Sequence, residues 1–237
     1  METLKLKPEN SWNRTWTQLF ALQTSKLDGL ACFEFWRGLD QLGFGLHFCP
    51  DIASIEKRLH ESSGWRLKDC QSMLPEDQFF DGIEKQIFPV ISWLRDEEQL
   101  LWSDEPDYWH DVFGHLPLLT DSRVQDLYLL FGKLARSIRL HHPEHLTSLA
   151  RIYWYSIEFG LIKQNSELKV YGAGLLPSPK AIDLIRARKI DATPFEISKV
   201  IEKDFDSEEL QTELFYINSW QDLYRQIIDW ANKENLL

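Results

Sequence analysis

The sequence predicts a mainly helical α+β domain with a few short strands. Apolar residues recur at helical spacing over most of the 237 residues, which favours amphipathic helices. Two short runs of β-branched and aromatic residues, Phe88–Leu94 and Leu210–Ile217, favour strands. Hydrophobic residues make up 43% of the chain, so it can bury a sizeable core. No linker rich in Gly, Ser or Pro divides it, and no repeat is visible.

Proline and glycine mark the ends of the helices expected in the first half of the chain. Pro50 precedes one helix, Gly64 follows it, and Pro75 begins the next. Proline suits the first turn of a helix and glycine suits the residue after the last turn. The expected elements are helices at 12–27, 30–42, 51–63 and 75–86, followed by a strand at 88–94.

Capping residues place the helices expected in the second half. Pro106 is tolerated early in a helix because the first turn needs no N–H from it. Thr120 and Asp121 begin a long helix, and Ser219 with Asp222 resembles a capping box. The expected elements are helices at 105–114, 120–140 and 145–162, a strand and tight turn at 169–174, helices at 178–188 and 195–202, a strand at 210–217 and a final helix from 219.

Charge and composition exclude several classes of function. The formal net charge of −11 disfavours nucleic acid and anionic membranes as partners. No run reaches the roughly 18 apolar residues of a membrane span, and the N-terminus lacks the apolar core of a signal peptide. Three cysteines, an odd number without CxxC spacing, argue against a disulfide framework. We therefore expect a cytoplasmic protein.

Two histidines and a glutamate carry the strongest chemical signal. His110 and His115 lie five residues apart, and Glu158 follows in an aromatic and apolar stretch. Two imidazoles and one carboxylate that leave coordination positions open are typical of non-haem Fe(II) centres that activate O2. A buried carboxylate is costly unless it is paired or bound to a cation. Glu158 therefore points either to a metal or to an arginine such as Arg139 or Arg151.

The histidines of this chain have three other interpretations: two residues with unrelated roles, a zinc hydrolase site, and a second metal site elsewhere. Histidines five apart on an ideal helix lie about 140° apart around its axis, so the pair is also compatible with unrelated roles. Gly114 and Pro117 favour a loosened turn that brings His115 back towards His110. Zinc hydrolysis needs the HExxH spacing, which this chain lacks. A second cluster, His141, His142 and His145, lies beside a proline in a polar turn and is more typical of a solvated loop.

Three joined motifs resemble the tetrahydropterin-dependent aromatic amino acid hydroxylases. The motifs are EPDYWHDVFGHLPL at 105–118, ARIYWYSIEFGL at 150–161 and YGAGLL at 171–176. Their order and spacing are close to those of the family, and the similarity extends from about residue 9 to the end. The resemblance implies the catalytic-domain fold of that family.

The resemblance also implies a function. It indicates a monooxygenase that uses Fe(II), a tetrahydropterin and O2 to hydroxylate the ring of an aromatic amino acid, with phenylalanine to tyrosine as the expected reaction. The same chemistry on tryptophan or on a secondary-metabolite precursor is one alternative. A degenerate member that binds metal or amino acid without turnover is another.

Roles for individual residues follow from the same resemblance. It implies that the catalytic metal ligands are His110, His115 and Glu158. The implied substrate-binding residues are Arg95, Ser103, Trp154 and Tyr216. The implied pterin-binding residues are Leu74, Pro75, Glu76, Phe79, Asp111 and Tyr153. Without the motifs, Arg95 would be read as a surface ion pair with Asp96 or Glu97, and the aromatic residues as core.

The chain departs from the family pattern in several places. Pro177 stands where the family usually has a serine near the first metal histidine, and Asp111 replaces a glutamate. Tyr216 replaces a smaller residue at a pocket position that the resemblance links to substrate choice. We expect residues 1–237 to form a single catalytic domain, shortened at its N-terminus and without regulatory or tetramerisation domains. A monomer or dimer is the expected state.

Overall fold

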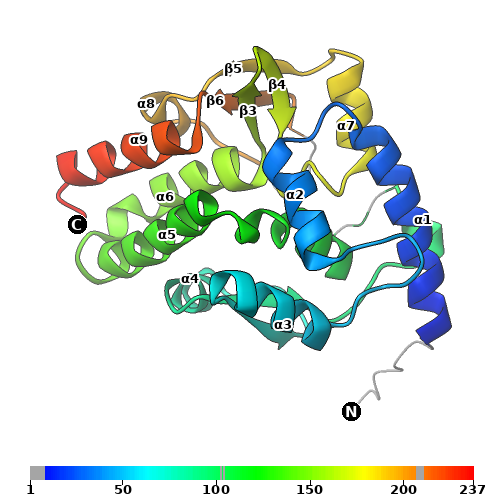
Figure 1. Ribbon diagram of the computed structural model, residues 1–237. Helices are drawn as coiled ribbons and strands as arrows, with labels where there is room; N and C mark the ends of the chain where they lie inside the picture. The colour runs from blue at the N-terminus through cyan, green and yellow to red at the C-terminus, as the bar shows by residue number, and fades with distance from the viewer. Residues whose placement is uncertain (1–8, 102, 104, 207–210) are drawn as a thin grey trace.

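Helices make up most of the computed structural model, which describes residues 9–101, 103, 105–206 and 211–237 (Figure 1). The α-helices of this part of the chain are α1 (Glu9–Leu27), α2 (Phe33–Leu42), α3 (Ile52–Ser63), α4 (Glu76–Glu84), α5 (Ser122–His141), α6 (Leu146–Tyr153), α7 (Pro179–Arg186), α8 (Ile197–Val200) and α9 (Trp220–Lys233). None of the described helices is long and apolar enough to span a bilayer. The predicted α+β class is confirmed.

Two small sheets complete the fold. β1 (Arg66–Cys70) pairs in parallel with β2 (Ile87–Ile91). The second sheet has the order β4-β3-β6-β5, with β3 (Gly160–Gln164), β4 (Glu167–Val170), β5 (Asp191–Pro194) and β6 (Glu213–Ile217). β4 runs antiparallel to β3, whereas β6 runs parallel to both β3 and β5. In Figure 1 this sheet lies at the top, above α5 and α6.

Several sequence predictions of secondary structure need correction. β1 and β5 were not predicted, because their residues are mostly polar and lack the apolar alternation of a half-buried strand. The helix expected at 145–162 ends at Glu158, and residues 160–164 form β3 instead. Gly160 permits this change, since a Cβ there would lie 2.2 Å from the Tyr171 hydroxyl. Leu210, the predicted start of β6, lies outside the described residues.

The helix expected at 105–114 also differs. Helical structure begins at Tyr108, and residues His110–His115 form a π-helix. Pro106 precedes the helix rather than lying inside it. Asp107 caps the helix, because its carboxylate accepts the His110 backbone N–H at 3.1 Å.

A buried carboxylate ties the helices to the second sheet. Glu34 of α2 accepts hydrogen bonds from Arg123 at 2.7 Å, from Gln164 at 2.7 Å and from the Trp220 indole at 3.0 Å. These partners belong to α5, β3 and α9, so one side chain joins four elements. The buried apolar side chains form one continuous cluster around them, which fixes the frame on which the site is built.

Candidate functional site

A cavity of about 630 Å³ contains the two histidines and the glutamate selected from the sequence. Its walls come from α4, β2, the loop after β2, the π-helix His110–His115 and a second π-helix, Trp154–Glu158, which continues α6. Apolar atoms dominate the lining, while a few polar side chains converge on one region. Such a cavity is the usual form of a small-molecule site.

The three side chains lie at the spacing that one metal ion requires. The Nε2 atoms of His110 and His115 are 3.1 Å apart. The Glu158 carboxylate oxygens lie 3.4 Å from His115 Nε2 and 3.7 Å from His110 Nε2. Ligand bonds of about 2.0–2.2 Å at right angles would separate neighbouring donor atoms by roughly 3 Å. A divalent cation between them therefore needs only small side-chain movements.

The two π-helices explain how residues at these positions converge. In a π-helix the backbone bonds run from residue i to i+5, so residues five apart come close together. The Leu116 N–H donates to the Asp111 carbonyl at 3.3 Å, and the Phe159 N–H donates to the Trp154 carbonyl at 3.0 Å. The loosened turn predicted around His115 is thus a π-helix, and His110 and His115 face each other across it.

A glycine permits the close packing behind the first π-helix. A Cβ at Gly114 would lie 2.5 Å from the Ala173 carbonyl oxygen. Ala173 belongs to the YGAGLL motif, so this contact joins the first and third motifs. A larger residue would push the histidine turn away from its support.

Burial sets the charge of the three candidate ligands. Desolvation lowers the pKa of His110 to about 4 and the pKa of His115 well below its ordinary value, so both imidazoles are neutral near pH 7. Desolvation also raises the pKa of Glu158 to about 8, with nearby Tyr153 opposing the shift. A divalent cation would offset the cost of the ionised carboxylate and bind the neutral imidazoles as they stand.

Asp111 is a second acid at the same place. One of its carboxylate oxygens, together with the ring nitrogens of His110 and His115, forms a group whose ligand atoms lie within 4.8 Å of one another. Burial raises the pKa of Asp111 well above its ordinary value. Its Oδ2 accepts the Ile91 backbone N–H at 2.7 Å, which holds the carboxyl towards β2. Glu158 lies within 3.7 Å of both histidines, and among the described residues its carboxylate accepts no backbone N–H, so its geometry suits the third ligand better.

Tyr128 of α5 contacts the far side of His115. Its hydroxyl lies 2.7 Å from the His115 Nδ1, and both side chains are buried. A histidine that binds a metal through Nε2 commonly has its Nδ1 fixed by a neighbouring polar group. Tyr128 was not predicted as a site residue, because it lies in the middle of an ordinary amphipathic helix.

Arg95 lies at another edge of the cavity. The alternative prediction, that it forms a surface ion pair with Asp96 or Glu97, is wrong. Only 7% of Arg95 is exposed. Its guanidinium donates to both oxygens of Asp107, at 2.8 and 2.7 Å, and its backbone N–H donates to the same carboxylate at 2.9 Å. Ser103 also lines the cavity, where its hydroxyl donates to the Glu105 carbonyl at 2.7 Å.

Two groups of aromatic rings line different parts of the cavity. Phe79 and Tyr153 form one group, with ring centroids 5.8 Å apart. Trp154, Phe159 and Phe205 form the other, and the buried Trp154 Nε1 has no hydrogen-bond partner among the described residues. Leu74 and Glu76 also line the cavity.

The cavity lining leaves out two residues that the resemblance assigned to ligands. Tyr216 lies in β6, where it pairs with Leu161 and Pro194, and Pro75 precedes α4. Pro177 does not line the cavity either. Its carbonyl accepts the Trp109 indole N–H at 3.0 Å. Three residues of the site were not predicted from the sequence: Phe159, Phe205 and Asp107. Phe159 and Asp107 nevertheless lie inside the motifs.

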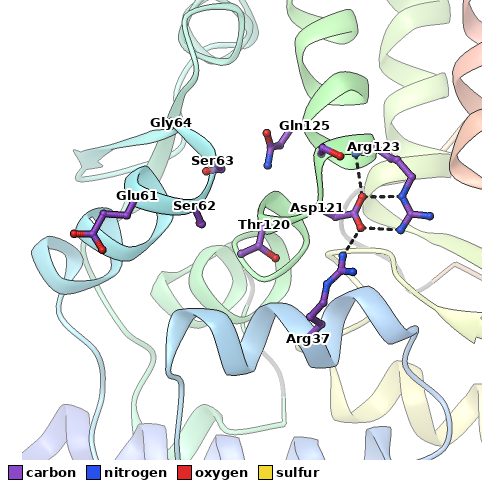
Figure 2. A pocket seen from close by; sticks show the side chains of 10 residues that line it. Arg37, Glu61, Ser62, Ser63, Gly64, Thr120, Asp121, Arg123 and Gln125 are labelled. Atoms are coloured by element: carbon purple, nitrogen blue, oxygen red, sulfur yellow. Dashed lines mark hydrogen bonds and ion pairs between the residues drawn. The ribbon is translucent and has the colours of Figure 1, made fainter.

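The remaining polar clusters differ in character from this cavity. Figure 2 shows a polar pocket beside the start of α5, where Asp121 pairs with Arg37 and Arg123. Both of its arginines are paired with acids, Arg37 with Asp121 and Arg123 with Asp121 and Glu34, so neither is an unpaired cation for an anionic ligand. His142 and His145 lie 3.7 and 4.0 Å from Glu144, and they belong to no metal-ligand group in the described chain.

Comparisons with known proteins agree with the geometry. The profile of a family described as "Biopterin-dependent aromatic amino acid hydroxylase" matches residues 5–236. The phenylalanine-4-hydroxylase of Caulobacter vibrioides is 35% identical over 209 residues, which are 88% of this chain and 70% of that protein. The Chromobacterium violaceum enzyme is 33% identical over 211 residues, which are 89% of this chain and 70% of that protein.

Solved structures extend the likeness to the fold. The C. violaceum phenylalanine hydroxylase with bound oxidised Fe(III) matches with a TM-score of 0.88 at 31% identity, covering 96% of this chain and 83% of that one. A cobalt-bound structure of the same enzyme matches with a TM-score of 0.87 at 31% identity, covering 92% and 78%. The human phenylalanine-4-hydroxylase is 27% identical, and the match covers 92% of this chain but 48% of the human protein.

Proposed function

Because the chain belongs to the family of biopterin-dependent aromatic amino acid hydroxylases, we propose that it hydroxylates the ring of phenylalanine to give tyrosine. The required partners are Fe(II), a tetrahydropterin and O2. The observation that carries the proposal is the arrangement of His110, His115 and Glu158, whose donor atoms lie 3.1–3.7 Å apart in a buried cavity.

The donor set fits iron in this role. Two neutral imidazoles and one carboxylate on one side of the ion leave the other side open to water, O2 and ligands. A zinc hydrolase would need a general base placed by the HExxH spacing. Asp111 follows His110 directly, but the second histidine stands five residues after the first rather than four, so the spacing of that motif is absent.

Arg95 would bind the carboxylate of the amino acid. Asp107 takes the Nε and one terminal nitrogen of its guanidinium, and within the described part of the chain the other terminal nitrogen has no partner, so it can meet a second anion. A guanidinium held in one plane binds a carboxylate with a defined direction. Trp154 and Phe159 would then receive the aromatic ring, since they supply apolar surface in the same cavity. Their bulk keeps water from the reacting ring.

The pterin would occupy the part of the cavity lined by Phe79 and Tyr153. Phe79 offers a ring face for stacking, and Leu74 and Glu76 lie beside it on the cavity wall. Asp111 would meet the pterin near the metal, where its high pKa favours the protonated, hydrogen-bond-donating form. When bound, the iron and the reduced pterin supply the electrons that activate O2.

Product identification tests the proposed function. Protein loaded anaerobically with Fe(II) and tetrahydropterin is given O2 and each aromatic amino acid in turn, and products are read by mass. Tyrosine from phenylalanine is expected, whereas 5-hydroxytryptophan as the main product would assign tryptophan as substrate. His115→Ala should abolish the product, and His142→Ala, outside the cavity, should retain it. No ring hydroxylation in the wild type would identify a degenerate member.

Three further proposals concern the whole chain. Residues 1–237 act as one catalytic domain, which is supported by the continuous core cluster of the described residues. The three cysteines are free thiols, which supports a reducing compartment, the cytoplasm. A monomer or dimer stays our prediction, and sedimentation equilibrium tests it.

A further inference from the structure

One phenylalanine outside every motif stacks on the aromatic wall of the cavity. The ring centroid of Phe205 lies 4.5 Å from that of Trp154, with an interplanar angle of 16°. Trp154 also packs against Phe159 at 4.6 Å. All three rings line the cavity that holds His110 and Glu158. Phe205 therefore covers part of Trp154 that a bound ring would otherwise contact.

The segment that carries Phe205 is fastened to the helix that carries Glu158. The Tyr155 hydroxyl donates to the Asp204 carbonyl at 2.6 Å. Arg151 donates to the Ile201 carbonyl at 2.5 Å and forms an ion pair with Asp204. The Phe205 ring is also perpendicular to the Tyr155 ring, with the two centroids 6.4 Å apart. Four contacts thus position Phe205 relative to the metal ligand.

The same segment is held from its other side. Lys203 forms an ion pair with Glu213 of β6 at 2.7 Å. Phe205 is 36% exposed, so one part of its ring faces solvent while another contacts Trp154. A ring placed in this way screens the tryptophan from water and limits the space beside it. The residue that the resemblance assigned to this task, Tyr216, does not line the cavity.

We propose that Phe205 is a specificity-determining residue, which forms the outer wall of the subsite for the substrate ring and restricts that subsite to a single ring. This inference rests on the proposed function, because it assigns the Trp154 side of the cavity to the amino acid ring. A hydrophobic pocket discriminates roughly 10- to 200-fold for each methylene-sized change in fit. Removing the Phe205 ring should therefore admit an indole.

Two substitutions at Phe205 and one at its tether test the proposal. Phe205→Ala should lower the ratio of kcat/KM for phenylalanine to kcat/KM for tryptophan by roughly tenfold or more. Phe205→Leu keeps apolar bulk and should lower the ratio less. Tyr155→Phe removes the hydroxyl that holds Asp204 and should shift the ratio in the same direction by a smaller factor. Phe48→Ala, at a side chain that is 61% exposed and outside the cavity lining, is the control.

Amino acid binding supplies a readout that does not need turnover. Calorimetric titration of the anaerobic, Co(II)-loaded protein with phenylalanine and with tryptophan should show tryptophan affinity rising about tenfold in Phe205→Ala. Unchanged ratios and affinities in folded, metal-loaded Phe205→Ala and Phe205→Leu would overturn the inference and leave the proposed function intact. Failure of the wild type to hydroxylate any ring would overturn the proposed function, and the binding titration would still decide the role of Phe205.

Discussion

Arg95 and Asp107 form a buried, bidentate ion pair at the edge of the cavity, with N–O distances of 2.8 and 2.7 Å. Asp107 is fully buried and also accepts the backbone N–H groups of Arg95 and His110. One carboxylate therefore fixes the guanidinium and caps the helix that carries the first metal histidine. The proposed carboxylate-binding group and the proposed metal site share a single support.

Replacing Arg95 by lysine should separate charge from geometry. Lysine keeps the positive charge but lacks the planar fork that Asp107 and a substrate carboxylate can share. Truncation of a charged hydrogen-bond partner costs about 2–5 kcal/mol, so the KM for phenylalanine should rise by one to several orders of magnitude in Arg95→Ala, and Arg95→Lys should recover only part of that loss. Steady-state kinetics measures the change, and metal content should stay at the wild-type value. Arg66→Lys, at an exposed ion pair with Glu56, is the control. If Arg95→Lys had the same KM for phenylalanine as Arg66→Lys, Arg95 would not be a substrate-binding residue.

Removing the hydroxyl of Tyr128 should weaken metal binding while the fold survives. The ring of Tyr128 packs in the core, and phenylalanine can fill the same space. The lost contact to His115 Nδ1 should cost about 10- to 100-fold in metal affinity, the usual effect of removing a group that orients a ligand. Titration with Co(II), followed by its visible absorption, measures the affinity in Tyr128→Phe. Tyr224→Phe, at an exposed position, is the control. If Tyr128→Phe bound Co(II) as tightly as the wild type, Tyr128 would not orient His115.

The metal-free protein should lose stability as the pH rises through the titration of Glu158. The folded pKa of about 8 lies above the ordinary value of 4.5, so between these values the folded state holds a proton that the unfolded state has released. Stability then falls with pH by roughly 1.4 kcal/mol per pH unit across this window. Glu158→Gln removes the titration, so without metal it should match the wild type near pH 5 and exceed it above pH 8.

With metal bound, the wild type should be more stable than Glu158→Gln above pH 8, the reverse of the metal-free order. The ionised carboxylate gains a cation in the wild type, whereas the amide of Glu158→Gln is a weaker ligand. Urea unfolding at pH 5 and above pH 8, with and without Co(II), gives the four comparisons. The lowered pKa values of His110 and His115 act in the opposite sense at low pH and are common to both proteins, so they cancel in the difference. A pH-independent difference would contradict the assignment of Glu158.

A methyl group at Gly114 should disturb the metal site through the backbone. The new Cβ would lie 2.5 Å from the Ala173 carbonyl oxygen, so the π-helix His110–His115 must shift. Overpacking of this kind costs about 1–3 kcal/mol. Thermal unfolding and Co(II) titration should therefore both show losses in Gly114→Ala. Gly45→Ala, which meets no atom within 4 Å, should show neither, and equal behaviour of the two variants would mean that the contact is easily relieved.

Much of the site could be predicted from the sequence, because its residues lie in short continuous motifs. His110, His115 and Glu158 belong to continuous stretches, and the structure brings them within 3.7 Å of one another. Capping residues likewise predicted most helices. The π-helices were not predicted, since each is a single turn, too short for its apolar pattern to reveal the inserted residue, and since they depend on distant contacts such as Gly114 with Ala173.

The features that could not be predicted depend on contacts between residues far apart in the sequence or on strand pairing. The buried state of Arg95 follows from its pairing with Asp107, twelve residues on, which its neighbours Asp96 and Glu97 conceal in the sequence. Phe205 reaches the cavity because Arg151 and Tyr155 hold its segment, and its own polar surroundings gave no signal. The polar edge strands β1 and β5 were missed for a similar reason, because pairing to their neighbours, rather than burial of a face, defines them.

The destination of the two oxygen atoms of O2 shows whether the protein is a ring hydroxylase that depends on this metal site. Fe(II)-loaded protein with a tetrahydropterin and phenylalanine is supplied with heavy-isotope O2, and the product is analysed by mass spectrometry. We expect one heavy oxygen atom on the ring of the tyrosine formed by the wild type, and no labelled product from His110→Ala or His115→Ala. Unlabelled tyrosine, or labelled tyrosine formed equally well by both variants, would contradict a ring hydroxylation that depends on this metal site.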